Sequence, residues 1–253
     1  MFDALRLRIL HDTPFVRNLR KAAISEKYCS FPVIDDKKCA PDCSDCISGC
    51  PTHAISAKPL RLDLGKCIGC GDCRNKCAGN AIEFKNSVKT SSSTREGLIV
   101  DGRTDYESYS KDAVATSKLI RKNFGRSLKM RQVSAGGCNG CELELSACSN
   151  VNFDMGRFGI EFVASPRHAD GIVVTGPVSS NMAKALDFAY RSIPDPKIVI
   201  ACGTCAISGG LFVSSPEISR QFFEQYKVDL YIPGCPPHPL TIINGILDLI
   251  GRK

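Results

Sequence analysis

Twelve of the fifteen cysteines in this chain of 253 residues fall into three sets of four. The first set is Cys39, Cys43, Cys46 and Cys50, the second is Cys67, Cys70, Cys73 and Cys77, and the third is Cys138, Cys141, Cys205 and Cys235. A cubane cluster needs four thiolates at its corners, and closely spaced cysteines in a loop can supply them. The spacing therefore predicts three 4Fe-4S clusters, and the chemistry of such clusters is electron transfer.

Disulfides and zinc are the two alternatives for so many cysteines. A disulfide scaffold is typical of short secreted chains, whereas the first residues here lack the apolar run of a secretory signal. We therefore expect a reducing compartment. Zinc ribbons pair two CxxC knuckles, but a run of three cysteines followed by Cys50-Pro51 is typical of a cubane. His53 could replace a cysteine as a metal ligand. Because four thiolates are available for each cluster, we expect His53 to be a solvated loop residue.

The first two sets lie in a segment that must fold tightly around them. The sequence PTHAI after Cys50 is echoed by AGNAI after Cys77. Residues 36–86 resemble the bacterial two-cluster ferredoxins, which are small α+β domains. That resemblance implies that the fourth cysteine of each run serves the other cluster. The implied ligand sets are Cys39, Cys43, Cys46 and Cys77 for one cluster, and Cys50, Cys67, Cys70 and Cys73 for the other. Two departures from the family pattern are the three residues between Cys39 and Cys43, and Ala78 in place of proline.

The third set needs a different scaffold, because its members are far apart in sequence. Short β-rich runs alternate with helical ones after residue 125, and predict strands at 129–135, 160–164, 171–175, 197–202 and 228–233. Helices of ten to fifteen residues are expected between most of them. Such alternation indicates a flavodoxin-like α/β domain with a parallel sheet. Cys138 and Cys141 follow the first strand, Cys205 the fourth and Cys235 the fifth, so three loops can converge on one cubane.

The predicted organisation has four parts. They are an N-terminal arm at 1–35, the ferredoxin-like domain at 36–86, a polar serine-rich linker at 87–123 and the α/β domain at 124–253. The arm mixes apolar and basic residues, which suits contact with a partner or a membrane surface, or an ordinary surface helix. Within the linker, residues 112–123 have the spacing of a short helix that leads into the α/β domain.

Several motifs in the α/β part together resemble a known family. They are FGRSL, GGCNGCELE, RFGI, SPRHAD, GTCAISGG and IPGCPP, within residues 124–250. This segment resembles the small subunit of group 4 membrane-bound NiFe hydrogenases, a family related to the cluster-bearing subunit of respiratory complex I. The resemblance implies that Cys138, Cys141, Cys205 and Cys235 hold the proximal cluster beside a catalytic large subunit. The chain would then be an electron-transfer subunit of an oxidoreductase, with the catalytic metal in its partner and no catalytic residue of its own.

A nickel-free complex-I-like oxidoreductase, coupled to ion translocation, is the alternative function. Complex I subunits usually have two adjacent cysteines where this chain has Cys138-Asn-Gly-Cys141, so the spacing favours the hydrogenase branch. A free-standing ferredoxin carrier would leave the third set unexplained. The implied partners are a large subunit, membrane-embedded antiporter-like or quinone-type subunits, and an electron donor such as ferredoxin. The implied location is peripheral, at the cytoplasmic face of a membrane.

Charge and hydropathy limit the other possibilities. No apolar run approaches the roughly 20 residues that span a bilayer. The formal charge of +7 suggests nucleic acid, but the basic residues are scattered. Twelve thiolates add about −12 and three cluster cores about +6, which leaves roughly +1. We therefore expect no nucleic-acid partner.

Six further residues could have chemical roles but have simpler interpretations. We expect Cys202 to end a buried strand, and Cys29 and Cys148 to be buried or incidental thiols. Glu142 is either a proton relay at the subunit interface or a surface or structural ion-pair residue. His168 and Asp170 either pair at a partner interface or form a structural turn.

Overall fold

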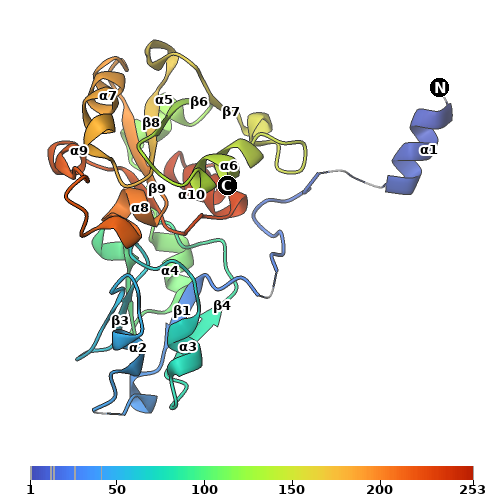
Figure 1. Ribbon diagram of the computed structural model, residues 1–253. Coiled ribbons are helices and arrows are strands. Elements are labelled where there is room, and N and C mark those ends of the chain that lie inside the picture. Colours follow the sequence, from blue (N-terminus) through green and yellow to red (C-terminus); the bar gives the residue numbers. More distant parts are fainter. Residues whose placement is uncertain (1, 12, 14, 26, 41, 253) are drawn as a thin grey trace.

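The computed structural model describes residues 2–11, 13, 15–25, 27–40 and 42–252. Figure 1 shows an N-terminal half and a larger C-terminal half that pack against each other, with α1 (Phe2–His11) projecting away from both. Within the described ranges, no helix combines the length and the apolar character needed to cross a membrane.

The N-terminal half is built from short elements. In chain order they are β1 (Phe31–Ile34), η1 (Asp36–Lys38), α2 (Asp45–Ser48), β2 (Ile55–Ser56), β3 (Arg61–Asp63), α3 (Asp72–Lys76), β4 (Ile82–Lys85), η2 (Glu96–Leu98), β5 (Ile99–Asp101) and α4 (Tyr106–Asp112). β1 pairs antiparallel with β4, and β3 pairs antiparallel with both β2 and β5. The cysteine runs lie in the loops between these elements and in α2 and α3.

The segment expected to be a linker is ordered and packs on both halves. Its strand β5 continues the small sheet, and the rings of Tyr106 and Tyr109 in α4 pack on Phe31. Ser92 exchanges two backbone hydrogen bonds with Tyr231 at the edge of the large sheet. The serine content predicted an exposed polar linker, but Ser87, Ser91 and Ser92 are buried. The division of the chain into domains stays a prediction.

The helix expected at 112–123 is partly wrong. α4 ends at Asp112, and the next helix, α5 (Lys118–Phe124), begins only after a break. The hydroxyl of Ser117 accepts a hydrogen bond from the Ile120 backbone N–H at 3.0 Å. This N-cap starts a new helix, which explains where α5 begins.

The C-terminal half contains a five-stranded parallel sheet. Its elements are β6 (Leu128–Ser134), α6 (Gly140–Ala147), η3 (Met155–Phe158), β7 (Ile160–Phe162), η4 (Pro166–His168), β8 (Gly171–Thr175), α7 (Ser180–Arg191), β9 (Ile198–Cys202), α8 (Thr204–Ser208), η5 (Gly210–Phe212), α9 (Gln221–Gln225), β10 (Leu230–Ile232) and α10 (Pro239–Leu249). The strand order is β10-β9-β8-β6-β7, which is the flavodoxin-like order. The five predicted strands and the parallel sheet are confirmed.

The expected helix lengths hold only in part. α7 has 12 residues, but α6 has 8 and α8 and α9 have 5 each. The α8 helix ends at Ser208, and the next residue, Gly209, has a φ of +87°, in the left-handed region that glycine adopts readily. Gly209 therefore explains why α8 is shorter than the apolar pattern predicts.

Both faces of the sheet are covered, so the central strands are buried along their whole length. Every residue of β8 and β9 is buried. Ile172 shares an apolar cluster with Leu186 of α7, whereas Val173 shares another with Leu145 of α6 and Ile243 of α10. The first cluster continues into the N-terminal half. Burying each such side chain contributes about 1.5–3 kcal/mol.

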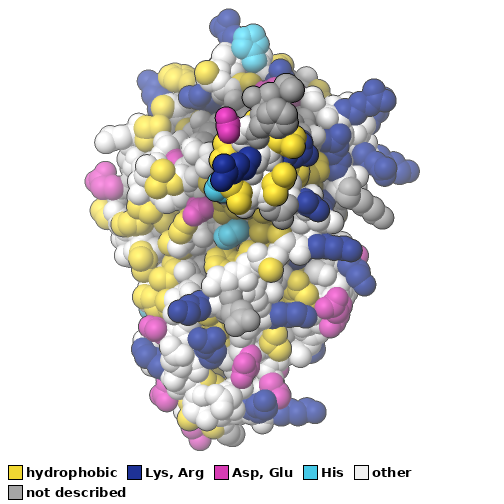
Figure 2. All heavy atoms as spheres, turned by 90° about the vertical axis from the view of Figure 1, so that its right-hand side faces the viewer, with side chains coloured by type: hydrophobic (Ala, Val, Ile, Leu, Met, Phe, Trp, Pro, Cys, Tyr) yellow, Lys and Arg dark blue, Asp and Glu magenta, His cyan; other side chains and the backbone are white. Residues whose placement is uncertain are grey.

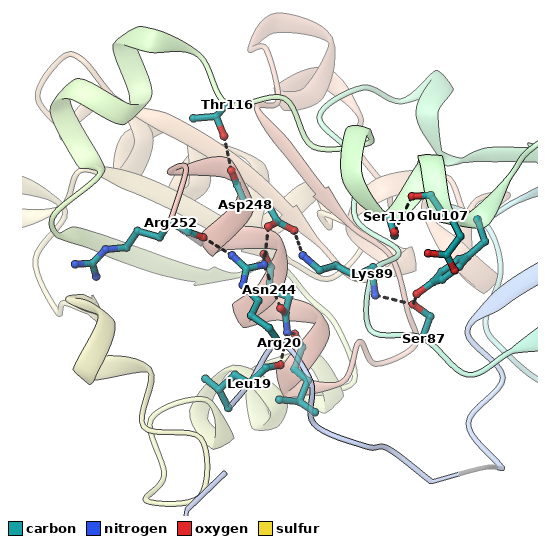
Figure 3. Close-up of polar contacts among 12 residues, drawn as sticks. Leu19, Arg20, Ser87, Lys89, Glu107, Ser110, Thr116, Asn244, Asp248 and Arg252 are labelled. Atoms are coloured by element: carbon teal, nitrogen blue, oxygen red, sulfur yellow. Dashed lines mark hydrogen bonds and ion pairs between the residues drawn. The ribbon is translucent and has the colours of Figure 1, made fainter. Parts of the chain in front are cut away.

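Polar contacts fasten the N-terminal segments to α10 (Figure 3). The Asp248 carboxylate accepts a hydrogen bond from Arg20 at 2.5 Å and forms a second ion pair with Lys89. The Asp248 carbonyl accepts one from the Thr116 hydroxyl at 2.5 Å. Burial lowers the pKa of Lys89, against the opposing effect of Asp248. Three segments far apart in sequence therefore meet at one helix end.

Candidate iron-sulfur sites

The loops after three strands bring Cys138, Cys141, Cys205 and Cys235 to one edge of the sheet, and we call these four residues the C-terminal group. Cys138 and Cys141 follow β6, Cys205 lies in α8 directly after β9, and Cys235 follows β10. All four line one cavity. Because the strands are parallel, these loops leave the sheet at its carboxyl edge, which is where ligands gather in such folds.

Glycine backbones make room for a bulky group between these thiols. A Cβ added at Gly203 would lie 2.4 Å from the Cys141 sulfur, and one at Gly210 would lie 3.0 Å from the Cys205 sulfur. Gly137, Gly140, Gly176 and Gly234 also line the cavity. Backbone can thus approach the sulfurs where a side chain could not. This set of four thiols with glycine walls fits a cubane held by four cysteines.

Burial and mutual proximity raise the pKa values of Cys141, Cys205 and Cys235 in the C-terminal group. Burial, the carboxylate of Glu142 and the other three thiols raise the pKa of Cys141 to about 12. Burial, followed by the nearby Cys235 and Cys138 thiols, raises the pKa of Cys205 to about 11. These contributions show that the other thiols of the group lie near Cys141 and Cys205. A positively charged cluster core would favour their thiolate form.

Glu142 is fixed within the protein by two hydroxyl groups. Its Oε1 accepts hydrogen bonds from Ser134 and Thr175, each at 2.6 Å. Those residues are the last of β6 and β8. The side chain is buried and lines the cavity of the C-terminal group. Glu142 is therefore not a surface residue, and among the described residues its partners are hydroxyl groups and not cations. No pattern in the sequence pointed to Ser134 and Thr175, because only the sheet brings them to this glutamate.

The N-terminal cysteines form two groups, each with members from both runs. The second N-terminal group is Cys50, Cys67, Cys70 and Cys73, which line one cavity together. The first N-terminal group is Cys39, Cys43, Cys46 and Cys77. Burial raises the pKa of Cys46, and the nearby thiols of Cys77, Cys39 and Cys43 raise it further. The fourth cysteine of each run thus lies with the first three of the other.

Burial also affects the pKa values of thiols in the second N-terminal group. Burial raises the pKa of Cys67 to about 12, with further contributions from Cys73, Cys50 and Cys70. Burial likewise raises the pKa of Cys73 to about 11. The Cys67 sulfur accepts a backbone hydrogen bond from Gly69 at 3.4 Å. Among the described residues, no three or more Cys, His, Asp or Glu side chains are placed to hold a single metal ion. The cysteine groups are therefore considered only for clusters, in which each thiolate binds a different iron atom.

A threonine hydroxyl links the second N-terminal group to the C-terminal group. Thr204 Oγ1 donates to the Cys67 carbonyl at 2.8 Å and lies 3.2 Å from the Gly234 carbonyl. Thr204 is 1% exposed and directly precedes Cys205. Next to it, a Cβ on Gly65 would lie 2.8 Å from the Ile207 side chain. The two cysteine loops are therefore packed together, a contact that sequence analysis did not reveal.

Known proteins resemble the C-terminal half in sequence. Residues 138–249 match the family described as NADH ubiquinone oxidoreductase, 20 Kd subunit. A probable membrane-bound hydrogenase subunit from Pyrococcus furiosus is 42% identical over 126 residues, which are 50% of this chain and 75% of that protein. The chain belongs to the 20 Kd subunit family. All of the cysteines in the C-terminal group lie within the matched residues.

Other members of the 20 Kd subunit family represent both branches. The formate hydrogenlyase subunit 7 of Escherichia coli is 41% identical over 55% of this chain and 55% of its own length. An NADH-quinone oxidoreductase subunit of Heliobacterium modesticaldum is 38% identical over 59% of this chain and 85% of its own length. The chain is therefore related to subunits of hydrogenases and of other oxidoreductases.

The remaining thiols lie outside the three groups. Cys202 is the last residue of β9 and is fully buried, which confirms the expected strand end. Cys148 is also fully buried, and burial raises its pKa. Cys29 is half-buried beside the loop of the second N-terminal group, where a Cβ on Gly71 would lie 3.6 Å from its sulfur. His53 is exposed, as expected of a loop residue.

Asp170 is part of a structural turn. Its carboxylate accepts a hydrogen bond from the Lys129 backbone N–H at 2.7 Å, and its own N–H donates to the Lys129 carbonyl. Its carbonyl accepts one from Ile198. His168 is exposed in η4. The structural interpretation of Asp170 is confirmed, since these bonds join the starts of three strands.

Proposed function

We propose that this chain carries electrons between a redox partner and the NiFe site of a large subunit in a membrane-bound hydrogenase complex. Three 4Fe-4S clusters, held by the first N-terminal, second N-terminal and C-terminal groups, would supply the one-electron chemistry. Flow in one direction reduces protons, and flow in the other oxidises hydrogen. The nickel site would belong to the partner, so the role of this chain would be electron transfer.

The hydrogen bond from Thr204 to the Cys67 carbonyl carries this proposal. It joins a loop of the second N-terminal group to the residue before a C-terminal-group cysteine. The two N-terminal groups are also neighbours, because Cys46 of the first contributes to the raised pKa of Cys73 in the second. Electrons would therefore pass from the first N-terminal group to the second, and from the second to the C-terminal group, each time between neighbouring groups.

The protein around these groups would tune and protect them. Backbone N–H groups at Gly69, Ala54 and Ala81 donate to the sulfurs of Cys67, Cys50 and Cys77. Such hydrogen bonds and the exclusion of water raise or lower a cluster's potential. The Ser134 and Thr175 hydroxyls would hold the Glu142 carboxylate in place beside the C-terminal group.

An apolar surface beside the C-terminal group suits the large subunit. Leu211, Phe212 and Val213 are 54%, 48% and 59% exposed, and they directly follow Gly210, which lies against the Cys205 sulfur. Exposed apolar side chains in a group are typical of protein interfaces. The further partners would be membrane-embedded antiporter-like or quinone-type subunits and a donor such as ferredoxin. The chain would lie peripherally at the cytoplasmic face.

A nickel-free complex-I-like oxidoreductase is the second candidate. The observation that favours it is the 85% coverage of the Heliobacterium modesticaldum NADH-quinone oxidoreductase subunit at 38% identity. In that case the C-terminal group would pass electrons to a quinone or another acceptor, with ion translocation as the coupled reaction. The residues of this chain would have the same roles in both candidates.

Metal analysis of the intact complex tests the proposal. The complex is purified without oxygen, and nickel and iron are measured per copy of this chain. Stoichiometric nickel with about twelve iron atoms from this chain, four for each cluster, supports the hydrogenase function. The same iron without nickel moves the assignment to the second candidate. Iron well below this amount in the isolated chain contradicts three clusters.

Matched cysteine variants assign the iron to the three groups. Cys235→Ser should lower the iron content of the chain by about four atoms, because a cluster that needs four cysteine ligands loses one of them. Cys148→Ser removes a thiol that lies outside every group and should leave the iron content unchanged. Equal iron loss in both variants would contradict the C-terminal assignment.

A further inference from the structure

We propose that a cavity lined by arginine side chains binds the phosphate group of an anionic phospholipid. This arginine cavity has a volume of about 440 Å³. It is lined by Arg17, Asn18, Leu19, Arg20, Arg157, Phe158, Leu247 and Arg252. No acidic residue is among these described lining residues. The cavity shares no residue with those of the cysteine groups, so this proposal is independent of the proposed function.

The arginines come from three segments and are held by backbone contacts. Arg157, in η3, donates from Nη2 to the Val16 carbonyl at 2.8 Å, and its guanidinium lies over the Phe158 ring at 5.0 Å. Arg252, after α10, donates to the Phe158 carbonyl. A guanidinium has five N–H donors, so these contacts orient each group and leave donors for a ligand.

The charge around the cavity favours an anion. Asp248 is the carboxylate that pairs with Arg20, and it also pairs with Lys89 (Figure 3). The single negative charge of Asp248 thus faces the two positive charges of Arg20 and Lys89. Arg157 and Arg252 add further positive charge. These charges repel one another less when an anion lies between them. Arginine presents a planar fork of donors that matches the oxygens of a phosphate.

Helix α1, which ends at His11 six residues before Arg17 of the cavity, favours a lipid over a soluble phosphate compound. Its side chains Leu5, Leu7, Ile9 and Leu10 are 60%, 55%, 75% and 68% exposed. Arg6 and Arg8 lie between them. Figure 2 shows hydrophobic side chains with Lys and Arg side chains gathered around them on this face. Exposed apolar side chains interspersed with arginines suit the membrane interface, where acyl chains and lipid phosphates lie close together. A soluble phosphate would use the arginines but leave the apolar helix uncovered.

Vesicle binding by the full chain, purified without oxygen with its clusters, tests this site. The probe is cosedimentation with phosphatidylcholine vesicles that contain phosphatidylglycerol. The double variant Arg157→Gln/Arg252→Gln should bind about 30-fold more weakly, because each arginine near an anionic surface accounts for about fivefold. The control Lys21→Gln/Lys122→Gln removes two exposed charges outside the cavity and should keep most of the binding. Unchanged visible absorbance of the clusters shows that both variants are folded.

A soluble probe distinguishes the source of the phosphate. Titration calorimetry with pyrophosphate is run on the same proteins. Vesicle binding that falls in the arginine variant and not in the control supports the proposal. Pyrophosphate binding without vesicle binding overturns the lipid and assigns the cavity to a soluble phosphate compound. Equal loss in the variant and control, or no binding of either probe, overturns the site itself.

Discussion

The two halves of this molecule hold their cysteines in different ways. In the C-terminal half, the cysteine loops extend from a sheet whose strands β8 and β9 are buried at every residue. In the N-terminal half, the elements between the cysteines are much shorter, with four residues in α2, five in α3 and two in β2. One scaffold is a packed core that positions loops, whereas the other is mostly loop.

This difference indicates what stabilises each half. Helices of one turn and two-residue strands are not stable in isolation. Metal binding by a site that the unfolded chain lacks adds its free energy to folding. We therefore expect cluster binding to hold the N-terminal half together, and apolar packing to hold the C-terminal half together.

Removal of iron should separate the two halves most strongly. After an iron chelator and a reductant strip the clusters, amides in residues 42–85 should lose most of their protection from hydrogen exchange. Amides of β8 and β9 should keep theirs, because these strands depend on the sheet core. Hydrogen exchange with mass spectrometry measures both regions in one sample. Equal loss of protection in both halves would remove the distinction.

Loss of one C-terminal ligand should affect function without unfolding either half. Cys235→Ser should abolish turnover of the complex, since the C-terminal group would lose its link to the partner. Electron paramagnetic resonance should still detect the N-terminal clusters. Turnover that remains unchanged would contradict the assignment of the C-terminal group, and Cys148→Ser is the matched control.

A cavity in the sheet core should lower stability while leaving the cysteine loops intact. Ile200→Ala removes a fully buried side chain from β9 and should cost about 2–5 kcal/mol in the free energy of unfolding. Urea unfolding of the full chain measures it. Val33→Ala, at a position 46% exposed in β1, should cost far less. A similar cost at both positions would show that the core does not dominate.

Loss of the Thr204 hydroxyl should weaken the contact between the halves. Thr204→Val keeps the shape of the side chain but leaves the Cys67 carbonyl without this donor, at a cost of about 0.5–1.5 kcal/mol. Faster hydrogen exchange in residues 64–69 should report it. Thr204→Ser retains the hydroxyl and should exchange like the wild type. Fast exchange in the serine variant as well would assign the effect to packing.

The smallest expected effect is a pH dependence in the N-terminal half. Hydrogen bonds from the Arg103 side chain and backbone lower the pKa of Asp101. Because the folded pKa lies below the unfolded one, Asp101 stabilises the fold above about pH 4, and this is lost as pH falls through the folded pKa. Arg103→Ala should thus reduce stability at neutral pH and lose its effect in acid. Urea midpoints at several pH values measure this, and a difference that persists in acid would contradict it.

Much of the C-terminal fold was predictable from local pattern. Residues 172–174 of β8 are all Ile or Val because both faces of that strand are covered, and such a run is visible in the sequence. The break between α4 and α5 was not predicted, because it depends on Ser117 as the N-cap of α5, and apolar spacing does not indicate caps. The polar segment around Ser92 was expected to be a connection, yet its backbone completes the edge of the sheet.

The sequence by itself determined the cysteine spacing, the strand pattern and the family, since these depend on residues close along the chain. Only the tertiary structure decided which loops touch. Thr204 reaches Cys67 across 137 residues, and the arginine cavity joins Arg20, Arg157 and Arg252 from three segments. Such contacts result from how the two halves and the arm pack on α8 and α10. No local pattern encodes them, because packing brings together residues whose sequence neighbours give no sign of the partner.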